Sequence, residues 1–126
     1  MKTKRCPNAD NVRRSSSATC WGPGIAIPVA LRRAGVAAAD VGAFEINEAF
    51  ASQAVHCVRA LGADPARVNP LGGAIALGHP LGCTGARLVA TLLHHMRRER
   101  LRYGVVSMCV GTGMGAAAVF ENTAAL

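Results

Sequence analysis

The chain has 126 residues and a net charge of +7, with 51% apolar but only 4% aromatic residues. This length suffices for one domain with a buried core and excludes two. No apolar run approaches the length of a bilayer span, and no basic stretch leads into a continuous apolar one. We therefore expect one domain, no membrane span and no secretory signal.

The basic residues gather in two places, within residues 1–20 and over residues 97–102. Such clusters can attract nucleic acid or a phosphate-bearing small molecule, or they can simply keep a protein soluble. The sequence contains no nucleic-acid-binding motif and few aromatic residues for base stacking. We expect no nucleic-acid partner and favour a phosphorylated small molecule.

The five cysteines form neither a metal motif nor an obvious disulfide framework. Their number is odd, and no pair has the C-x-x-C or histidine–cysteine spacing of a zinc site. We expect no metal site and a reducing compartment. The cysteines are Cys6, Cys20, Cys57, Cys83 and Cys109.

Residues 1–20 are polar, basic and serine-rich, without periodicity, and we interpret them as a flexible tail of unclear origin. A targeting peptide and an artefact of a fragmentary sequence are the alternatives. The predicted domain covers residues 21–126. Its first helix begins near Pro23 or Pro28 and ends at Gly35.

A strand is predicted over 41–47, with Phe44 and Ile46 on one face, followed by a helix over 48–61. Asn47 would be a good N-cap for this helix. Its predicted apolar stripe excludes Gln53 and His56. The stripe consists of Phe50, Ala54, Cys57, Val58 and Leu61.

The second half of the chain alternates in the same way. Five glycines and two prolines over 68–85 predict an extended piece and a tight loop, and apolar residues at helical spacing predict a helix over 84–98. Strands over 103–109 and 116–120 flank a glycine turn. This alternation predicts an α/β fold with helices covering a sheet.

The glycine turn over 111–115 looks like part of a dinucleotide fingerprint, but no helix follows it to hold a pyrophosphate. Its glycines could instead aim backbone N–H groups at a developing negative charge. Cys109 lies at the end of the preceding strand, where it is either a reactive thiol or a buried small residue.

His79 lies between Gly78 and Pro80, so a turn fixes its backbone. It could polarise a carbonyl group or accept a proton from a thiol, and the alternative is an exposed loop histidine. Asn47 could orient a water or a substrate carbonyl instead of capping a helix. Asn69, before Pro70, is most simply a turn residue.

Three segments in this order resemble the C-terminal signatures of thiolases. They are Asn47-Glu48-Ala49-Phe50, the glycine-histidine stretch over 72–82, and Cys109-Val110-Gly111-Thr112-Gly113-Met114-Gly115. The resemblance extends over about 21–121. The last segment is most similar to the peroxisomal-type 3-ketoacyl-CoA thiolases, which are acetyl-CoA C-acyltransferases.

The resemblance implies a thiolase-like C-terminal domain with a mixed β-sheet covered by helices, half of a layered α/β/α/β/α arrangement. It implies that Cys109 is the catalytic acid/base and that His79 activates a nucleophilic cysteine and holds the thioester oxygen. Asn47 would anchor a water in the oxyanion hole that holds the enolate oxygen, and Gly111 would donate its backbone N–H in a second oxyanion hole. Phe50 would lie on the coenzyme A or acyl side.

The family relationship also implies coenzyme A thioesters as substrates in fatty-acid β-oxidation, with no tightly bound cofactor. Thiolases keep the nucleophilic cysteine in their N-terminal half, so we expect that half or a second chain as a partner, and a homo-oligomer when complete. The alternative is an inactive fragment or interaction module. The resemblance implies a peroxisomal location, although Ala124-Ala125-Leu126 is not a peroxisomal tripeptide; mitochondrial and cytoplasmic locations are the alternatives.

Overall fold

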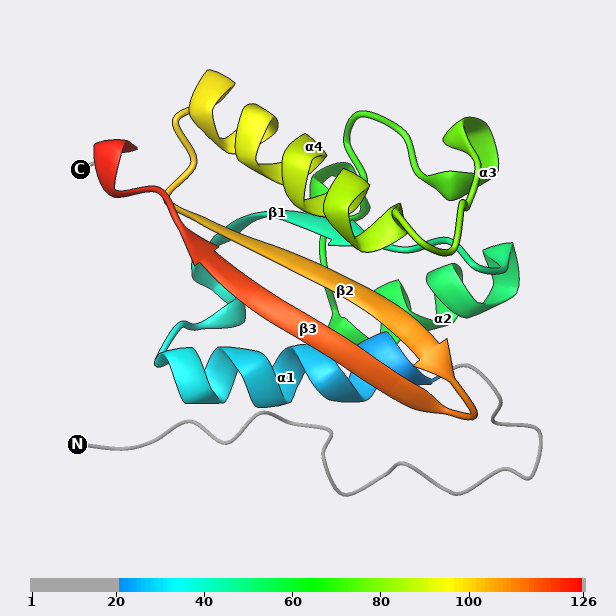
Figure 1. Cartoon of the computed structure of the whole chain (residues 1–126). Coiled ribbons are helices and arrows are strands. Elements are labelled where there is room, and N and C mark those ends of the chain that lie inside the picture. Colours follow the sequence, from blue (N-terminus) through cyan, green and yellow to red (C-terminus); the bar gives the residue numbers. More distant parts are fainter. Residues whose placement is uncertain (1–20, 126) are drawn as a thin grey trace.

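The computed structural model describes residues 21–125, so the predicted tail over 1–20 lies outside the described residues. The described chain contains four α-helices, three strands and three short 3₁₀ turns (Figure 1). The helices and strands are α1 (Gly22–Ala34), β1 (Val41–Ile46), α2 (Ala51–Leu61), α3 (Ala74–Leu77), α4 (Thr84–Arg98), β2 (Tyr103–Gly111) and β3 (Met114–Glu121). The 3₁₀ turns are Ala38–Asp40, Pro65–Arg67 and Thr123–Ala125.

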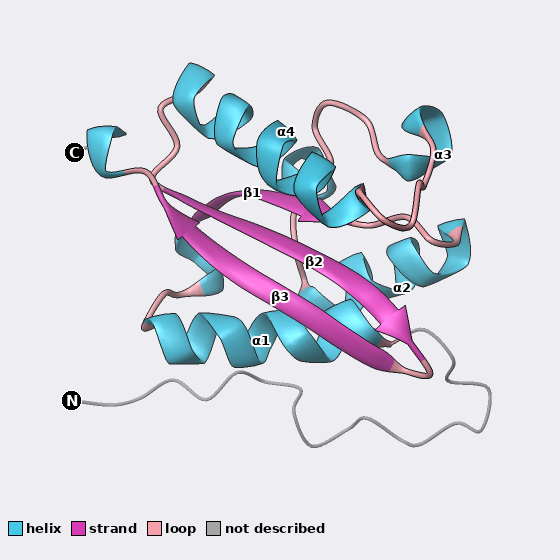
Figure 2. Ribbon diagram, viewed as in Figure 1, coloured by secondary structure: helices cyan, strands magenta, loops and turns pink. Residues whose placement is uncertain are grey.

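The three strands form one mixed sheet in the order β1-β2-β3. β1 runs parallel to β2, and β2 runs antiparallel to β3. The parallel pair needs a long crossover, which contains α2, α3 and α4. Figure 2 shows α4 on one face of the sheet and α1 on the other, with α2 beside α1. The predicted α/β fold, with helices covering a mixed sheet, is confirmed.

Alternating side chains give the sheet one apolar core on each face. On the α1 face, Phe44 and Ile46 share a face as predicted and pack against Ile27 and Leu31. On the α4 face, the helix contributes three buried residues, one per turn, over Ala43 and Val106. These are Leu88, Leu92 and Met96.

α1 lies unusually close to β3. A Cβ atom at Gly22 would stand 2.5 Å from the carbonyl oxygen of Met114, and one at Gly115 would overlap the backbone of Gly22. The helix begins at Gly22 with Pro23 in its first turn, which resolves the ambiguous start, and Pro28 lies inside it. Only glycine at both positions permits this approach of helix to strand.

The glycine turn between β2 and β3 is a two-residue hairpin. Thr112 and Gly113 both have positive φ, 46° and 78°, as a type I′ turn requires. Gly111 pairs with Met114, and Cys109 pairs with Gly115 two residues further from the turn. The hairpin therefore fixes Cys109 near the carboxyl end of β2.

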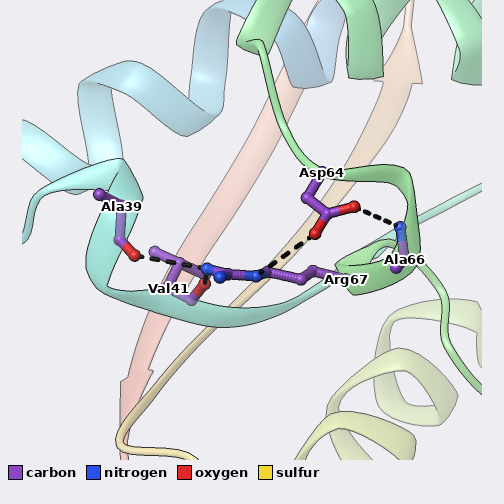
Figure 3. A network of polar contacts seen from close by, with 5 residues as sticks. All are labelled: Ala39, Val41, Asp64, Ala66 and Arg67. Atoms are coloured by element: carbon purple, nitrogen blue, oxygen red, sulfur yellow. Dashed lines mark hydrogen bonds and ion pairs between the residues drawn. The ribbon is translucent and has the colours of Figure 1, made fainter.

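Arg67 ties the chain after α2 to the start of β1 (Figure 3). Its Nη1 donates to the carbonyl oxygens of Ala39 and Val41 at 3.4 and 3.2 Å, and its Nε lies 3.8 Å from Asp64 Oδ2. Asp64 Oδ1 accepts from the backbone N–H of Ala66. The glycine-rich segment therefore starts beside β1 and leads toward its carboxyl end.

Two predictions for the first part of the crossover, up to the end of α2, were wrong. The helix begins at Ala51, and Phe50, not Asn47, occupies its N-cap position. Gln53 is buried together with Cys57, whereas Phe50 is 64% exposed. The helix begins later than predicted because Asn47 still pairs with β2 and the chain bends at Ala49 and Phe50 before the helix starts.

The second part of the crossover follows the prediction more closely. α4 has the predicted bounds, whereas the four-residue α3 inside the glycine-rich segment was not predicted. Glycines and prolines limit such an element to a single turn. Within residues 21–125, no helix has the length and apolarity needed to cross a bilayer.

Candidate active site

A cavity of about 970 Å³ lies where β1 and β2 end. Parallel strands end at the same edge of a sheet, which is where α/β folds commonly bind ligands. β2 contributes Cys109 and Gly111 to the lining, and His79 comes from the loop before α4. Phe50, Gln53, His56 and Trp21 contribute from the α1 and α2 side.

Asn47 follows β1 directly and is only 1% exposed. Its backbone N–H donates to Ser107 O of β2 at 2.9 Å, so the residue continues the strand pairing instead of starting a helix. Its side-chain Nδ2 lies 3.3 Å from His79 Nε2. The capping role is excluded, and the structure brings two predicted site residues, 32 positions apart, into direct contact.

The hydrogen bonds around His79 define its tautomer. Thr84 Oγ1 donates to the carbonyl oxygen of Pro80 at 2.9 Å, which uses the only hydroxyl proton. The same oxygen lies 2.8 Å from His79 Nδ1, and we assign it as the acceptor of a hydrogen bond from the N–H of that nitrogen. Nε2 then carries a lone pair, which accepts from Asn47 Nδ2. In this arrangement Nε2 is available as a base.

Thr84 is a site residue that the sequence reasoning missed. It was interpreted only as the start of α4, yet it is completely buried and orients the imidazole. The sequence offered one signal of this role, a hydroxyl residue five positions after a histidine and in the first turn of a predicted helix. Helical periodicity alone treats this position as the first member of the apolar stripe.

Glu48 fastens the glycine-rich loop to the end of β1. Its Oε2 accepts from the backbone N–H of Ile75 at 2.9 Å, and its Oε1 accepts from Asn69 Nδ2 at 3.1 Å. The carboxylate lies directly over Gly73, where a Cβ atom would overlap it. This contact holds the loop in the position from which it reaches His79.

Asn69 is a turn residue, as predicted, with φ of 47°. Its side chain also acts as a strand partner. Oδ1 accepts from the N–H of Ile46 at 2.8 Å, and Nδ2 donates to Ile46 O at 2.9 Å. The amide therefore satisfies both backbone groups at the last residue of β1, directly before Asn47.

Cys109 is half-buried and alternates onto the α1 face of the sheet with Val105. Gly111, which has a φ of 104°, is the last residue of β2 and lines the same cavity. Phe50 lies at the exposed rim. The structure thus places Cys109, Gly111, Phe50 and His79 around one cavity, and hydrogen bonding links Asn47 to it through His79.

Two buried ionisable groups have raised pKa values. Burial raises the pKa of Glu45 to about 7; the positive charge of Arg87 opposes this, and Glu48 adds to it. Burial also raises the pKa of Cys57, with hydrogen bonds from Gly24 and Gln53 acting against it. Among the described residues, the Glu45 carboxylate accepts no hydrogen bond.

Residues 5–122 match the protein family described as "Thiolase, C-terminal domain". The chain belongs to this thiolase family. The human peroxisomal 3-ketoacyl-CoA thiolase is 69% identical over 101 residues, which are 79% of this chain and 24% of the human protein. The peroxisomal 3-ketoacyl-CoA thiolase 2 of Arabidopsis thaliana is 64% identical over 103 residues, 80% of this chain and 22% of that protein.

A solved structure supports the same family. The peroxisomal 3-ketoacyl-CoA thiolase of Saccharomyces cerevisiae aligns with a TM-score of 0.72 and 59% identity, over 80% of this chain and 29% of that one. That enzyme is described as a five-layered α-β-α-β-α structure built from two core domains. The predicted family and fold are confirmed, and this thiolase chain spans about a quarter of the length of the curated relatives it matches.

Proposed function

We propose that this thiolase domain supplies the acid/base and oxyanion-binding part of a 3-ketoacyl-CoA thiolase site. The observation that carries the proposal is the Asn47–His79–Thr84 hydrogen-bond chain beside the cavity that Cys109 lines. It presents a basic imidazole nitrogen next to a thiol at the carboxyl ends of two parallel strands. The relatives named above are 3-ketoacyl-CoA thiolases, which supports this substrate class.

In the cleavage direction, a nucleophilic cysteine attacks the 3-keto carbonyl after His79 Nε2 has taken its proton. The bond between C2 and C3 then breaks, and its electron pair passes to the enolate of acetyl-CoA. The Cys109 thiol protonates C2, and its thiolate then takes the thiol proton of coenzyme A. The coenzyme A sulfur attacks the acyl group, and the nucleophilic cysteine leaves as a thiolate that recovers its proton from His79. The Gly111 N–H and a water oriented by Asn47 stabilise the oxyanions, each donor contributing about 3 kcal/mol.

The nucleophile is proposed to come from an N-terminal thiolase domain or a second chain. Of the cysteines in the described part, Cys57 is buried, Cys83 is exposed away from the cavity lining, and Cys109 is assigned to proton transfer. Large apolar side chains at the cavity rim and on α3 are exposed, a pattern typical of a surface that another domain covers. They are Phe50, Ile75, Leu77, Leu81 and Val110.

Deuterium incorporation tests the proton-transfer role without requiring the whole reaction. The purified chain, incubated with acetyl-CoA in D₂O, is expected to exchange the α-protons of the acetyl group, as measured by mass spectrometry. Cys109→Ala should abolish the exchange, whereas the matched control Cys83→Ala should retain it. Equal exchange by both variants, or none by the unmodified chain, would contradict the proposal.

The exposed apolar rim also favours a second candidate, an interaction module without catalysis. Thiolysis of a 3-ketoacyl-CoA distinguishes the two. Turnover that requires an added N-terminal thiolase domain and is lost in Cys109→Ala would support the enzyme. Stable association with that domain, unaltered by Cys109→Ala and without turnover, would support the module.

We also propose a peroxisomal location, and a homo-oligomer when the site is complete. The names of the relatives support the location, and one solved relative is described as a dimeric peroxisomal thiolase. Co-localisation of a fluorescently tagged chain with a peroxisomal marker tests the compartment. Sedimentation of the reconstituted enzyme tests the oligomer.

A further inference from the structure

Glu45 and Arg87 are charged residues whose polar atoms are buried without a partner among residues 21–125. Glu45, on β1, is completely buried, and neither of its carboxylate oxygens accepts a hydrogen bond. The Nε, Nη1 and Nη2 atoms of Arg87, on α4, are also buried, and none of them donates one. No ion pair within 4.0 Å joins these two described residues, although the charge of Arg87 acts on the Glu45 carboxyl group. They therefore lie near each other without touching.

The two residues form the inner of two connections between β1 and α4, the helix that packs over this strand (Figure 2). Glu45 and Asn47 lie two positions apart, so their side chains share the face of the sheet under α4. Thr84 and Arg87 lie three positions apart on α4, so they are neighbours on one side of the helix. The outer connection is the Asn47–His79–Thr84 hydrogen-bond chain, and Glu45 and Arg87 lie further from the edge of the sheet.

Asn47 adds an unpartnered atom to the same region. Its Nδ2 lies 3.3 Å from His79 Nε2, whereas its Oδ1 is buried and accepts no hydrogen bond from the described part of the chain. A side-chain amide can turn over and exchange its oxygen and nitrogen, so one orientation is fixed only when both atoms have partners. A donor to Oδ1 would therefore hold Nδ2 against His79.

Water is the ligand that fits these three residues. A guanidinium only donates hydrogen bonds and an ionised carboxylate only accepts them, whereas water does both. Glu45 would repel an anion and Arg87 would repel a cation, which favours a small neutral molecule. Buried polar atoms nearly always have partners, and a buried water makes about three hydrogen bonds to groups that the protein leaves unpaired. Such a water can also reach Asn47 Oδ1, the next group along the same face of β1.

We propose that Glu45 and Arg87 hold a buried cluster of water molecules that donates to Asn47 Oδ1. The cluster keeps the amide turned so that Nδ2 faces His79. Neither Glu45 nor Arg87 lines the cavity, so both are positioning residues that touch no substrate. The catalytic value of the cluster rests on the proposed function, in which the Asn47 amide orients the water of an oxyanion hole. The water site itself does not depend on that function.

Nuclear magnetic resonance of the purified chain tests for the water. A rotating-frame Overhauser cross-peak should join the Arg87 Nε–H signal to the water signal, with the sign of through-space transfer and not of proton exchange. The double variant Glu45→Leu, Arg87→Met replaces both charges by apolar side chains, a change that buried ion pairs often tolerate. Oxygen-17 relaxation dispersion counts long-lived bound waters, and the double variant should hold fewer than the wild type.

The side-chain amide signals of Asn47 test the positioning role. In the double variant these signals should shift and broaden, because the amide samples both orientations. The rate constant for deuterium exchange into acetyl-CoA should fall about tenfold with an unchanged KM, because a misplaced donor slows the reaction without weakening binding. Glu45→Gln still binds water, so it should keep the amide signals and most of the rate. A merely structural defect would raise the KM as well.

Arg97→Met is the matched control. It makes the same substitution at an exposed arginine of α4 that does not line the cavity, and should leave the waters, the amide signals and the rate unchanged. Circular dichroism would show whether the double variant folds. If it does not, the Arg87 cross-peak in the wild type still carries the test.

The possible failures are distinguishable. If the wild type shows no cross-peak between Arg87 and water, or the double variant holds as many long-lived waters, the water site is wrong. If the waters are lost but the Asn47 signals do not change, the positioning role is wrong. If the waters and the Asn47 signals behave as expected but the wild type exchanges no deuterium into acetyl-CoA, the proposed function fails, while the water site and its hold on Asn47 are supported.

Discussion

Thr84 Oγ1 accepts a hydrogen bond from His79 Nδ1 at 2.8 Å, while its own proton is committed to Pro80 O. This relationship leaves the His79 Nε2 lone pair facing Asn47. A single buried hydroxyl group therefore decides which imidazole nitrogen can act as a base. The proposed chemistry depends on this orientation as much as on the histidine itself.

Thr84→Val should change the tautomer of His79. The substitution keeps the shape of the side chain but removes the acceptor for Nδ1–H, so the proton is expected to move partly to Nε2. Nitrogen-15 chemical shifts of the imidazole would detect the change. Thiolysis of a 3-ketoacyl-CoA by the chain together with an N-terminal thiolase domain should slow at least tenfold, because His79 is proposed to take the proton of the nucleophilic cysteine. Thr84→Ser restores the hydroxyl and should recover both signals; an unchanged tautomer in Thr84→Val would contradict the assignment.

Asn47→Ala should slow the proposed enolate chemistry about a hundredfold, because it removes the amide that orients the oxyanion-hole water. The measurement is again deuterium exchange into acetyl-CoA. Asn69→Ala provides a comparison, since Asn69 contacts the backbone of the adjacent Ile46 and not His79. If Asn69→Ala loses as much deuterium exchange as Asn47→Ala does, the effect of Asn47→Ala is purely structural.

Glu48→Ala should release the glycine-rich loop. The substitution removes the acceptors for the Ile75 N–H and for Asn69 Nδ2, which should reduce the free energy of unfolding by about 1–3 kcal/mol. Hydrogen exchange at the Ile75 amide should accelerate before the rest of the domain does. Glu48→Gln keeps one acceptor oxygen and should lose less; identical exchange at Ile75 in all three proteins would show that the contact does not hold the loop.

The domain should become less stable as pH rises from about 4.5 to 7, because Glu45 titrates in this range. Burial raises its folded-state pKa from 4.5 to about 7, so the folded protein retains a proton that the unfolded chain has released. The stabilisation by this retained proton is complete below pH 4.5 and is lost as pH rises through 7. The free energy of unfolding should fall by about 3 kcal/mol over this range. Urea unfolding at several pH values measures it.

Glu45→Gln is the control for this dependence. The amide does not titrate, so the pH dependence between 4.5 and 7 should flatten, and the variant should be more stable than the wild type above pH 7. The same slope in both proteins would show that Glu45 is not its source. Arg87 faces the carboxylate and limits the upward shift in pKa, so Arg87→Met should move the transition to still higher pH.

Local chemistry was enough to predict much of the fold. The stripe of Leu88, Leu92 and Met96 repeats at helical spacing, and α4 has the predicted bounds. The glycines after Cys109 predict a turn between two strands, and the hairpin is there. Phe44 and Ile46 alternate onto one face as strand residues do. Each of these features depends on residues only a few positions apart.

The site was predictable as a set of residues but not as an arrangement. The three motifs predicted Asn47, His79 and Cys109 as candidate site residues, because side-chain type and backbone constraint can be read along the chain. They did not show that Asn47 lies outside the following helix and does not cap it. They also did not show that Gln53 would be buried and Phe50 exposed. Those outcomes depend on how the turn over 47–50 meets α1 and the loop before α4.

By itself, the sequence determined the family and the α/β class and proposed three candidate site residues, since motifs, periodicity and turn chemistry are local properties. Only the tertiary structure decided that Asn47 meets His79 and that Trp21 packs against His56. The Trp21–His56 contact joins residues 35 positions apart in sequence (56 minus 21). Such contacts arise because β1 and β2 pair in parallel and their crossover returns the chain to one edge of the sheet, a consequence of packing that no short window of sequence contains.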